Sequence, residues 1–486
     1  MSQLRVAPSA VDDTTLASAC LPLIREHRGL SGIVPLREAY DAFAARVLLA
    51  EAAERTLDVQ YYIWHNDLSG TLLLDALRRA ADRGVRVRLL LDDNNTMGLD
   101  ELLSALDAHP AIEVRLFNPF RRRRARWLDY LTDFARLNRR MHNKSFTADN
   151  QVTIVGGRNV GDEYFGAGHD VLFVDLDVLA IGPVVNEVSQ DFERYWHSES
   201  AWPVGRVLAP ASTTSTAHVT AAAARALSNP DAAIFVQAVE RQPFVRDLIE
   251  RRLTFDWAVT RMVSDDPAKG LGRAADDALL WSRLKDLMGA PASELHLVSP
   301  YLVPGKAGSR HFKALAKRGV KASVLTNSLE ATDVAAVHAG YARYRRPMLE
   351  SGVRIFEMKR TSAPSLRRPM IASSGSSRSS LHAKTFAIDR SRIFVGSFNF
   401  DPRSARLNTE LGFVIDSPGL ASQLAAVFTE RVPVRAYSVR LRTGGRLQWT
   451  EMRDGRDLVY EREPGAGTGL RLVVAALSVL PIEWLL

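Results

Sequence analysis

The stretch that decides the fold is His142–Asp149, HNKSFTAD, because the chain contains its pattern twice. The second copy is His382–Asp389, HAKTFAID, and the shared His, Lys and Asp positions lie 240 residues apart. GGRN at 156–159 and GSFN at 396–399 follow at the same offset. A chain of this composition matches His-x-Lys-x4-Asp by chance roughly 0.01 times, so two matches in register indicate a duplicated unit.

The repeat extends outward from the motif to the segments before it. LDVQYYIW at 57–64 and LHLVSPYLV at 295–303 are typical of buried strands. Residues 76–91 and 314–325 each run from a helix through Arg-Gly-Val into a strand, and VRLF at 114–117 is matched by VRIF at 353–356. Helices that alternate with short apolar strands predict an α/β fold with one largely parallel sheet in each half.

The length of 486 residues exceeds what one core usually supports, so two domains are expected. We predict an N-terminal segment at 1–44, a first domain at 45–205, a connecting segment at 206–270, a second domain at 271–440 and a C-terminal segment at 441–486. Thr361–Ser380, rich in Ser, Arg and Pro, is predicted to be a loop before the second motif.

The composition limits the classes of function that the chain can have. A net charge of +8 favours anionic partners: nucleic acid, acidic lipid headgroups or phosphate-bearing substrates. Cys20 is the single cysteine, which excludes an internal disulfide and a cysteine-based zinc site. No stretch reaches the ~20 apolar residues that a bilayer-spanning helix needs.

The motif residues point to phosphodiester chemistry. Two domains related by a pseudo-twofold axis would bring His142, Lys144, His382 and Lys384 into one cleft. Alternation predicts that each motif is a strand with its His and Lys on one face. One neutral imidazole can attack phosphorus and form a phosphohistidine, while the other, protonated, donates to the leaving oxygen. A single histidine near a lysine is more often structural, but the duplication favours catalysis.

The remaining candidates support this pair. Lys144 and Lys384, with Asn159 and Asn399, are expected to hold the non-bridging oxygens, so that no metal and no cofactor is needed. Gly157 and Ser397 are predicted to bind the phosphate. The glycines at 156, 157 and 396 are predicted to allow it to approach the backbone closely, although a plain tight turn would look the same.

Carboxylates are needed to fix the histidine tautomers. Asp175 and Glu410, related by an offset of 235, are the predicted residues, with Asp177 as the alternative to Asp175. Asp149 and Asp389 are predicted to brace the ends of the motif strands through hydrogen bonds, the alternative being ordinary turn aspartates.

With both motifs intact, the chain resembles the phospholipase D superfamily from about Leu57 to Arg440. QYYIWH at 60–65, GGRNVGDEYF at 156–165 and NFDPRS at 399–404 are similar to the bacterial cardiolipin synthase branch, especially its C type. The resemblance implies two tandem α/β/α sandwich domains with the active site between them, and a phosphatidyl-histidine intermediate. It assigns catalytic roles to the following residues: His142, Lys144, Asp149, His382, Lys384 and Asp389. Family precedent favours His142 as nucleophile.

The resemblance also implies the partners. The phosphatidyl group is transferred to phosphatidylglycerol, from either phosphatidylglycerol or phosphatidylethanolamine. We expect a peripheral enzyme on the cytoplasmic side of the bacterial inner membrane. The two N-terminal membrane helices of the longer cardiolipin synthases are absent from this sequence, so membrane access is expected to come from elsewhere.

Two segments could contact the membrane. Leu470–Leu486 is apolar, with a final core strand or helix as its alternative interpretation. Arg121–Arg140 contains eight arginines with Trp127, Leu128, Tyr130 and Leu131 among them, and the alternative here is a solvated charged face.

Three other functions compete with phosphatidyl transfer. A phospholipase D would give the same intermediate to water, and a phosphodiesterase or nuclease would use the same arginines for nucleic acid. The apolar C-terminal end argues against nucleic acid as the partner. A binding module with a decayed site is disfavoured because neither motif has lost a residue.

Overall fold

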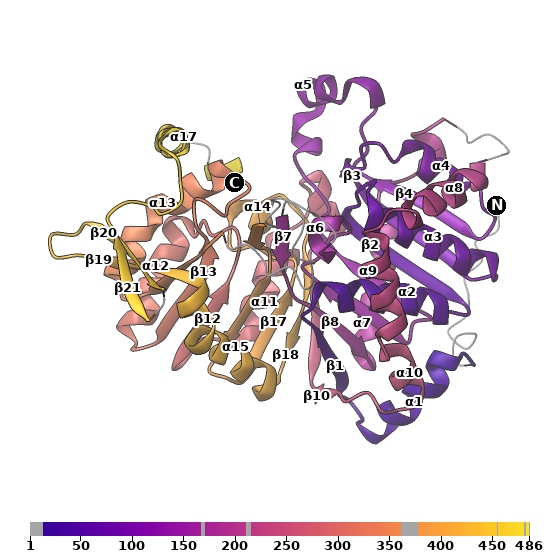
Figure 1. The fold of residues 1–486 in the computed structure, drawn as a ribbon, viewed down its shortest axis with the longest axis horizontal. Coiled ribbons are helices and arrows are strands. Elements are labelled where there is room, and N and C mark those ends of the chain that lie inside the picture. Colours follow the sequence, from indigo (N-terminus) through magenta and orange to yellow (C-terminus); the bar gives the residue numbers. More distant parts are fainter. Residues whose placement is uncertain are drawn as a thin grey trace.

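The computed structural model describes residues 13–166, 171–209, 215–360, 378–453, 455–480 and 483–485. It consists of two halves side by side, each a mixed sheet flanked by helices (Figure 1). The predicted α/β class with two tandem sandwich domains is confirmed. The loop expected at Thr361–Ser380 lies outside the described residues, except for its last three, which belong to a strand.

The first half is built on a nine-stranded sheet of order β10-β1-β8-β6-β5-β2-β3-β4-β9. Its strands are β1 (Ser31–Leu36), β2 (Thr56–Ile63), β3 (Arg86–Asn95), β4 (Ile112–Phe117), β5 (Ser145–Ala148), β6 (Val152–Gly156), β8 (Asp177–Ile181), β9 (Ala201–Pro203) and β10 (Asp256–Ala258). The helices are α1 (Thr15–Glu26), α2 (Ala39–Ala52), α3 (Leu68–Asp82), α4 (Asp100–Asp107), α5 (Arg126–Leu137), α6 (Asp162–Phe165), α7 (Pro183–Trp196), α8 (Ser215–Leu227), α9 (Ala232–Arg241) and α10 (Phe244–Ile249).

The second half is built on a ten-stranded sheet of order β11-β18-β17-β16-β12-β13-β14-β19-β20-β21. Its strands are β11 (Thr260–Ser264), β12 (Glu294–Val298), β13 (Lys321–Asn327), β14 (Arg354–Met358), β16 (Lys384–Ile388), β17 (Arg392–Gly396), β18 (Leu411–Ile415), β19 (Ala436–Leu441), β20 (Leu447–Arg453) and β21 (Arg456–Tyr460). The helices are α11 (Leu280–Met288), α12 (Gly305–Lys317), α13 (Ala335–Glu350), α14 (Pro402–Arg406), α15 (Pro418–Glu430), α16 (Val432–Arg435) and α17 (Thr468–Val479).

The predicted repeat appears as two equivalent blocks of sheet. In the first half β2, β3 and β4 are parallel, with β5 antiparallel on the other side of β2. In the second half β12, β13 and β14 are parallel, and β16 lies antiparallel beside β12. Both motifs therefore lead into the same strand of their blocks, which gives them equivalent positions.

The sheets extend beyond the domain boundaries expected from the sequence. Strand β1, from the expected N-terminal segment, pairs with β8, and β10, from the expected connecting segment, pairs with β1. The chain passes from the first sheet to the second between Ala258 and Thr260. The other end of the chain adds β20 and β21 to the second sheet, and α17 packs on α13 through Val474 and Ala339.

The two halves share a buried apolar seam. Val155 and Val178 of the first half belong to the same buried cluster as Val395, Leu411 and Phe413 of the second. A two-stranded parallel sheet, β7 (Val171–Val174) with β15 (Arg378–Leu381), also joins them. Backbone bonds and apolar packing therefore fix the two motifs relative to each other. No helix within the described residues is long and apolar enough to cross a membrane.

Candidate active site

Both motif histidines lie just before a strand of their own sheet, at the seam between the halves. Strand β5 begins at Ser145 and β16 at Lys384, so the histidines precede the strands rather than belonging to them as predicted. His142 and His382 are 6% and 7% exposed, and the two lysines are 1% exposed. Burial, then repulsion from Lys144, Lys384 and His382, holds the pKa of His142 well below its usual value. This coupling places all four groups in one site.

Each histidine receives its carboxylate from the opposite half. His142 Nδ1 lies 2.7 Å from Glu410 Oε2, and His382 Nδ1 lies 2.5 Å from Asp175 Oδ2. Asp177 instead pairs with Arg46 at 2.8 Å, so Asp175 is the carboxylate that contacts a histidine. A bond at Nδ1 orients each ring with its Nε2 edge away from the carboxylate, which is the geometry a nucleophile or proton donor needs.

The backbone repeats this exchange. The N–H of His142 donates to the carbonyl of Thr409 at 2.8 Å, one residue before Glu410. The N–H of His382 donates to the carbonyl of Val174 at 2.9 Å, one residue before Asp175. Each imidazole is thus held at two points, through its backbone and its ring, by consecutive residues of the other half.

The two carboxylates differ electrostatically. Burial raises the pKa of Glu410 to about 7, although attraction to Lys144 and hydrogen bonds from Ser397 and Ser404 oppose the rise. Burial acts in the same direction on Asp175, but attraction to His382 and Lys384 outweighs it and holds its pKa below the usual range. The His382 dyad therefore keeps an ionised partner over a wider pH range than the His142 dyad.

The residues after each motif support these carboxylates. A Cβ at Gly157 would lie 2.2 Å from Asp175 Oδ1, so this position has to be glycine. Its counterpart Ser397 donates its hydroxyl to Glu410 Oε2 at 2.5 Å. Both residues therefore contact the carboxylates, and their predicted role in binding phosphate stays a prediction.

The lysines and asparagines lie around the histidine pair. Lys144 Nζ donates to the carbonyl of His142 at 2.5 Å, and Lys384 Nζ lies 3.0 Å from His382 Nδ1. Burial lowers the pKa of both ammonium groups. Asn159 donates to the Tyr164 hydroxyl at 3.0 Å. Asn399 Oδ1 is buried, with no hydrogen-bond partner among the described residues, which leaves this atom available for a ligand.

Four supporting residues were not assigned by the sequence analysis. Tyr62 packs edge-on against His142 with centroids 4.8 Å apart, and Tyr164 against His382 at 5.2 Å. Ser404 donates to Glu410 Oε1 at 2.7 Å, and Arg158 donates to the carbonyl of Asp175 at 2.8 Å. All four lie in the segments that carry the family resemblance, which is the signal that could have found them.

The motif aspartates lie at the opposite end of the strands from the histidines. Asp149 accepts the N–H groups of Glu54, Arg55 and Thr56 at 2.8–3.0 Å, which tie the start of β2 to the β5–β6 turn. Asp389 accepts three N–H groups of residues 292–294 in the same way before β12. Five residues of extended chain separate Asp149 from Lys144, a span of about 16 Å.

Within the described part of the chain, one group of side chains has the spacing of a metal site: His65, Asp67 and Glu163. Asp67 already accepts N–H groups from Gly70 and Asp162, at 2.9 and 2.7 Å. This group contains none of the motif residues. The expectation that catalysis needs no metal stays a prediction.

Two tandem α/β domains that meet at a His-Lys pair from each half define a protein of the phospholipase D type. Phosphatidylserine synthase of Haemophilus influenzae Rd KW20 has the same fold, with a TM-score of 0.59 at 12% identity over 96% of this chain and 100% of that one.

Sequence comparison gives the family. The profile described as "Cardiolipin synthase, PLD-like domain" matches residues 47–196 and 284–432, and the chain belongs to this family. Cardiolipin synthase C of Escherichia coli (strain K12) is 51% identical over 97% of this chain and 99% of that protein. A cardiolipin synthase of Staphylococcus aureus (strain Mu50) is 24% identical over 82% of this chain and 66% of its own length.

Proposed function

We propose that this protein is a phosphatidyltransferase that makes cardiolipin through a covalent phosphatidyl-histidine. The observation that carries the proposal is the pair of crossed dyads, His142 with Glu410 and His382 with Asp175. The relationship to cardiolipin synthase C over nearly the whole chain supports the choice of lipid substrates. Phosphatidylglycerol is the acceptor, and phosphatidylglycerol or phosphatidylethanolamine is the donor.

The roles of the histidines follow from their charges. A nucleophile has to be neutral, and burial, then Lys144, Lys384 and His382, hold the pKa of His142 well below its usual value. A general acid has to carry a proton, and Asp175 opposes the fall in the pKa of His382. We therefore assign attack on phosphorus to His142 and proton transfer to His382.

The reaction proceeds in two displacements. His142 Nε2 attacks the donor phosphorus, the bond from phosphorus to the headgroup oxygen breaks, and His382 gives that oxygen its proton. The freed glycerol or ethanolamine leaves. His382 then takes the proton from a headgroup hydroxyl of the second phosphatidylglycerol, whose oxygen attacks phosphorus and releases His142. Lys144 and Lys384, with Asn159 and Asn399, stabilise the charge on the non-bridging oxygens.

A product assay tests the activity. Purified protein with phosphatidylglycerol vesicles is expected to give cardiolipin and glycerol, and added phosphatidylethanolamine should release ethanolamine only if it serves as donor. Phosphatidic acid as the sole product would identify a hydrolase. Cleavage of an oligonucleotide in the same buffer, without lipid turnover, would identify a nuclease.

A trapping experiment tests the roles. With a radiolabelled phosphatidyl donor whose leaving group needs no proton, His382→Ala should still form the covalent adduct and then release it slowly. His142→Ala should form none. The opposite labelling pattern would exchange the two roles, and the absence of any adduct in either variant would exclude the covalent route.

Enzymes that act on bilayer lipids have to meet the membrane surface. We place this protein peripherally on the cytoplasmic side of the bacterial inner membrane, in keeping with its relationship to cardiolipin synthase C. Fractionation of cells that express the tagged chain is expected to find it with membranes and to release it by carbonate. Recovery in the salt-free soluble fraction would contradict this placement.

A further inference from the structure

We propose that the exposed apolar edges of α5 and α17 together form a docking surface for the anionic lipid bilayer that supplies the substrate. The α5 edge is Trp127, Leu131 and Phe134, and the α17 edge is Leu472, Val473 and Val479. The proposal rests on the phosphatidyl-transfer function, because a lipid surface is the occupant that the site requires.

The α5 edge is apolar and held out from the body of the protein. Its three side chains are 44–74% exposed. Trp127 and Leu131, four residues apart, lie on the same side of the helix, and Phe134 is exposed in the turn that follows. The helix changes direction at Asp133, which has non-helical φ and ψ. An apolar stripe that no part of the described chain covers is unusual for a monomer in water and typical of a membrane contact.

Most arginines around α5 form ion pairs that hold the helix in its projecting position. Arg123 pairs with Asp93 and Asp100, Arg122 with Asp129, and Arg140 with Asp92. The run of arginines at 121–140 is therefore largely paired with carboxylates of the same half. Because the base of α5 is pinned in this way, the apolar edge is presented on a rigid support.

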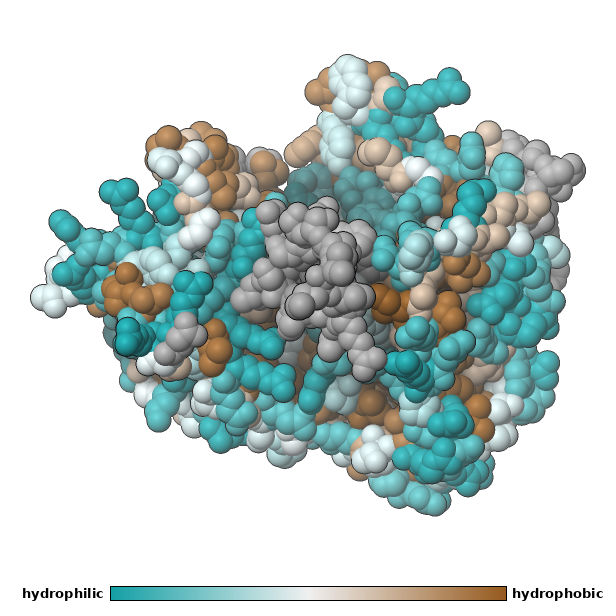
Figure 2. All heavy atoms as spheres, in the orientation of Figure 1, coloured by the Kyte–Doolittle hydropathy of each residue, from teal (hydrophilic) through white to brown (hydrophobic). Residues whose placement is uncertain are grey.

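The α17 edge is the outer face of a helix whose inner face is packed. Val474 and Leu477 lie against α13, whereas Leu472, Val473 and Val479 are 50–79% exposed. In Figure 1, α5 and α17 project from the same side of the molecule, with α14 and β7 at the seam between them. Figure 2 shows hydrophobic residues over both projections.

A single residue connects the two projections. Arg403 of α14 donates to the carbonyl and the side-chain oxygen of Asn138, which ends α5, and to the carbonyl of Leu485 beyond α17. Its neighbour Ser404 holds Glu410, the partner of His142. The two edges and the active site are therefore fixed to one short helix. A flat surface that contacts both edges would cover the seam where the substrate has to enter.

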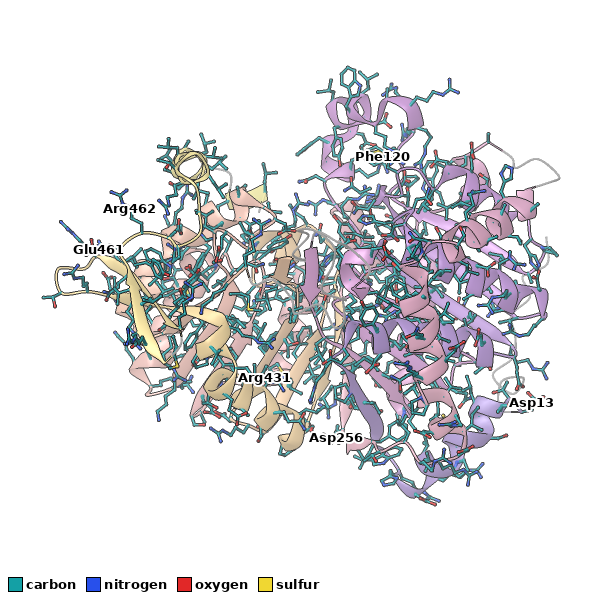
Figure 3. All side chains as sticks on the ribbon, viewed as in Figure 1. Asp13, Phe120, Asp256, Arg431, Glu461 and Arg462 are labelled. Carbon is teal, nitrogen blue, oxygen red and sulfur yellow. The ribbon has the colours of Figure 1, made fainter. Side chains whose placement is uncertain are left out.

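Charge selects an anionic surface. Arg121 and Arg124 beside α5 are exposed, with no ion-pair partner among the described residues, and the same holds for Arg462 near the start of α17. Figure 3 shows Arg462 pointing outward below α17. Arginines that flank an apolar edge contact lipid phosphates while the edge enters the headgroup region.

Vesicle sedimentation tests the docking surface. Trp127→Ser/Leu131→Ser/Phe134→Ser and Leu472→Ser/Val473→Ser/Val479→Ser should each lower binding to phosphatidylglycerol vesicles by about tenfold or more, and their combination by more than either. The control, Leu227→Ser/Ile234→Ser/Ile249→Ser, removes side chains of 39–52% exposure elsewhere and should bind like the parent protein. If either edge variant binds like this control, the proposal is wrong.

A charge variant tests the choice of lipid. Arg121→Ser/Arg124→Ser/Arg462→Ser should weaken binding to phosphatidylglycerol vesicles by about fivefold for each arginine at low salt, and leave binding to phosphatidylcholine vesicles unchanged. Equal losses on both vesicles would remove the electrostatic part of the proposal. Dimerisation that both edge variants abolish, with vesicle binding intact, would assign the surface to a second copy of the chain.

Two further readouts separate docking from chemistry. Turnover of a short-chain, monomeric phosphatidyl donor should be the same in the parent and the edge variants, whereas failure of the parent on every donor would contradict the proposed function and leave the vesicle result standing. Leu131→Cys and Leu472→Cys, labelled with an environment-sensitive dye, should shift to the blue on vesicles, unlike Ile234→Cys. Cys20 does not interfere, because it is buried and burial raises its pKa to about 12.

Discussion

At the scale of single residues, the two histidines are distinguished by the carboxylates behind them. Glu410 has a pKa raised to about 7 by burial, whereas the pKa of Asp175 is held low by His382 and Lys384. The two imidazoles therefore lie in different electrostatic environments. Burial lowers the pKa of both rings, but the fall is opposed by Asp175 at His382 and is larger at His142.

The pH dependence of kcat/KM follows from these pKa values. Below pH 7 Glu410 takes up a proton and ceases to accept the Nδ1–H of His142, so activity is expected to fall as the pH drops through about 7. Glu410→Gln should lower activity and remove this acid limb. Asp175→Asn should lower the pKa of His382 and move the alkaline limb to lower pH, with a rate loss of about 10³–10⁴. If neither variant changes the acid or the alkaline limb of the pH dependence of kcat/KM, these assignments are wrong.

Lys144 is expected to be required for activity and to lower the free energy of unfolding. Burial holds its pKa well below 10.5, so at pH 7 the folded state binds this proton less readily than the unfolded state. Lys144→Met should abolish turnover but raise the free energy of unfolding by about 1–3 kcal/mol.

The stabilisation should also depend on pH in a defined direction. The parent protein gains stability as the pH rises from 7 towards 10.5, because the unfolded chain loses its excess proton, and Lys144→Met should lack that gain. Urea unfolding at pH 7 and 9 measures both quantities. Lys313→Met, at an exposed lysine, is the control and should change little. Destabilisation by Lys144→Met at pH 7 would contradict the argument.

At the scale of elements, the motif joins the two ends of one strand. His142 and Lys144 precede β5 on the side of the seam, and Asp149 follows it at the far end, bonded to the backbone before β2. The five-residue spacing between Lys and Asp in both copies is therefore a strand length. This explains why the aspartates belong to the motif without contacting the imidazoles.

Replacement of the aspartates is expected to affect folding more than chemistry. Asp149→Ala leaves three N–H groups, one of them buried, without this acceptor and should lower the free energy of unfolding by about 1–3 kcal/mol. Asp389→Ala should cost less, because its surroundings are more exposed. Activity per folded molecule should stay within about threefold of the parent. Denaturant unfolding with normalised kinetics measures both, and a large kinetic loss at unchanged stability would make Asp149 catalytic.

The sequence predicted which residues belong to the site better than which of them contact each other. The repeat register paired Asp175 with Glu410, and the structure places both at the histidines. Which histidine each one serves depends on how two sheets pack, and no spacing within one half contains that information. The same limit applies to the arginines of α5, whose acidic partners lie up to 48 positions away in the chain, as for Arg140 and Asp92.

At the scale of the whole molecule, the two halves share one buried seam. The seam buries apolar side chains from both sheets, with Phe413 fully buried, and backbone bonds cross it beside each histidine. Strands β1 and β10 pair in the first sheet, although both lie outside the predicted first domain at 45–205. They also lie outside the repeated unit, so the repeat could not reveal them.

Calorimetry is expected to give a single cooperative unfolding transition for the intact chain, because neither half buries its seam alone. Phe413→Ala should lower stability by about 3–5 kcal/mol, through loss of packing shared by both halves. A control at an exposed apolar residue, Val434→Ala, should leave the transition in place. Two well-separated transitions in the parent protein would show that the halves unfold independently.

The exchange of carboxylates between the halves also bears on ancestry. A shorter polypeptide with one motif would have to associate with its own twin, since its imidazole would lack a partner otherwise. Once fused in tandem, the two copies no longer need to be identical and can specialise. Glycine at 157 in one half and serine at the equivalent position 397 in the other are a trace of that freedom.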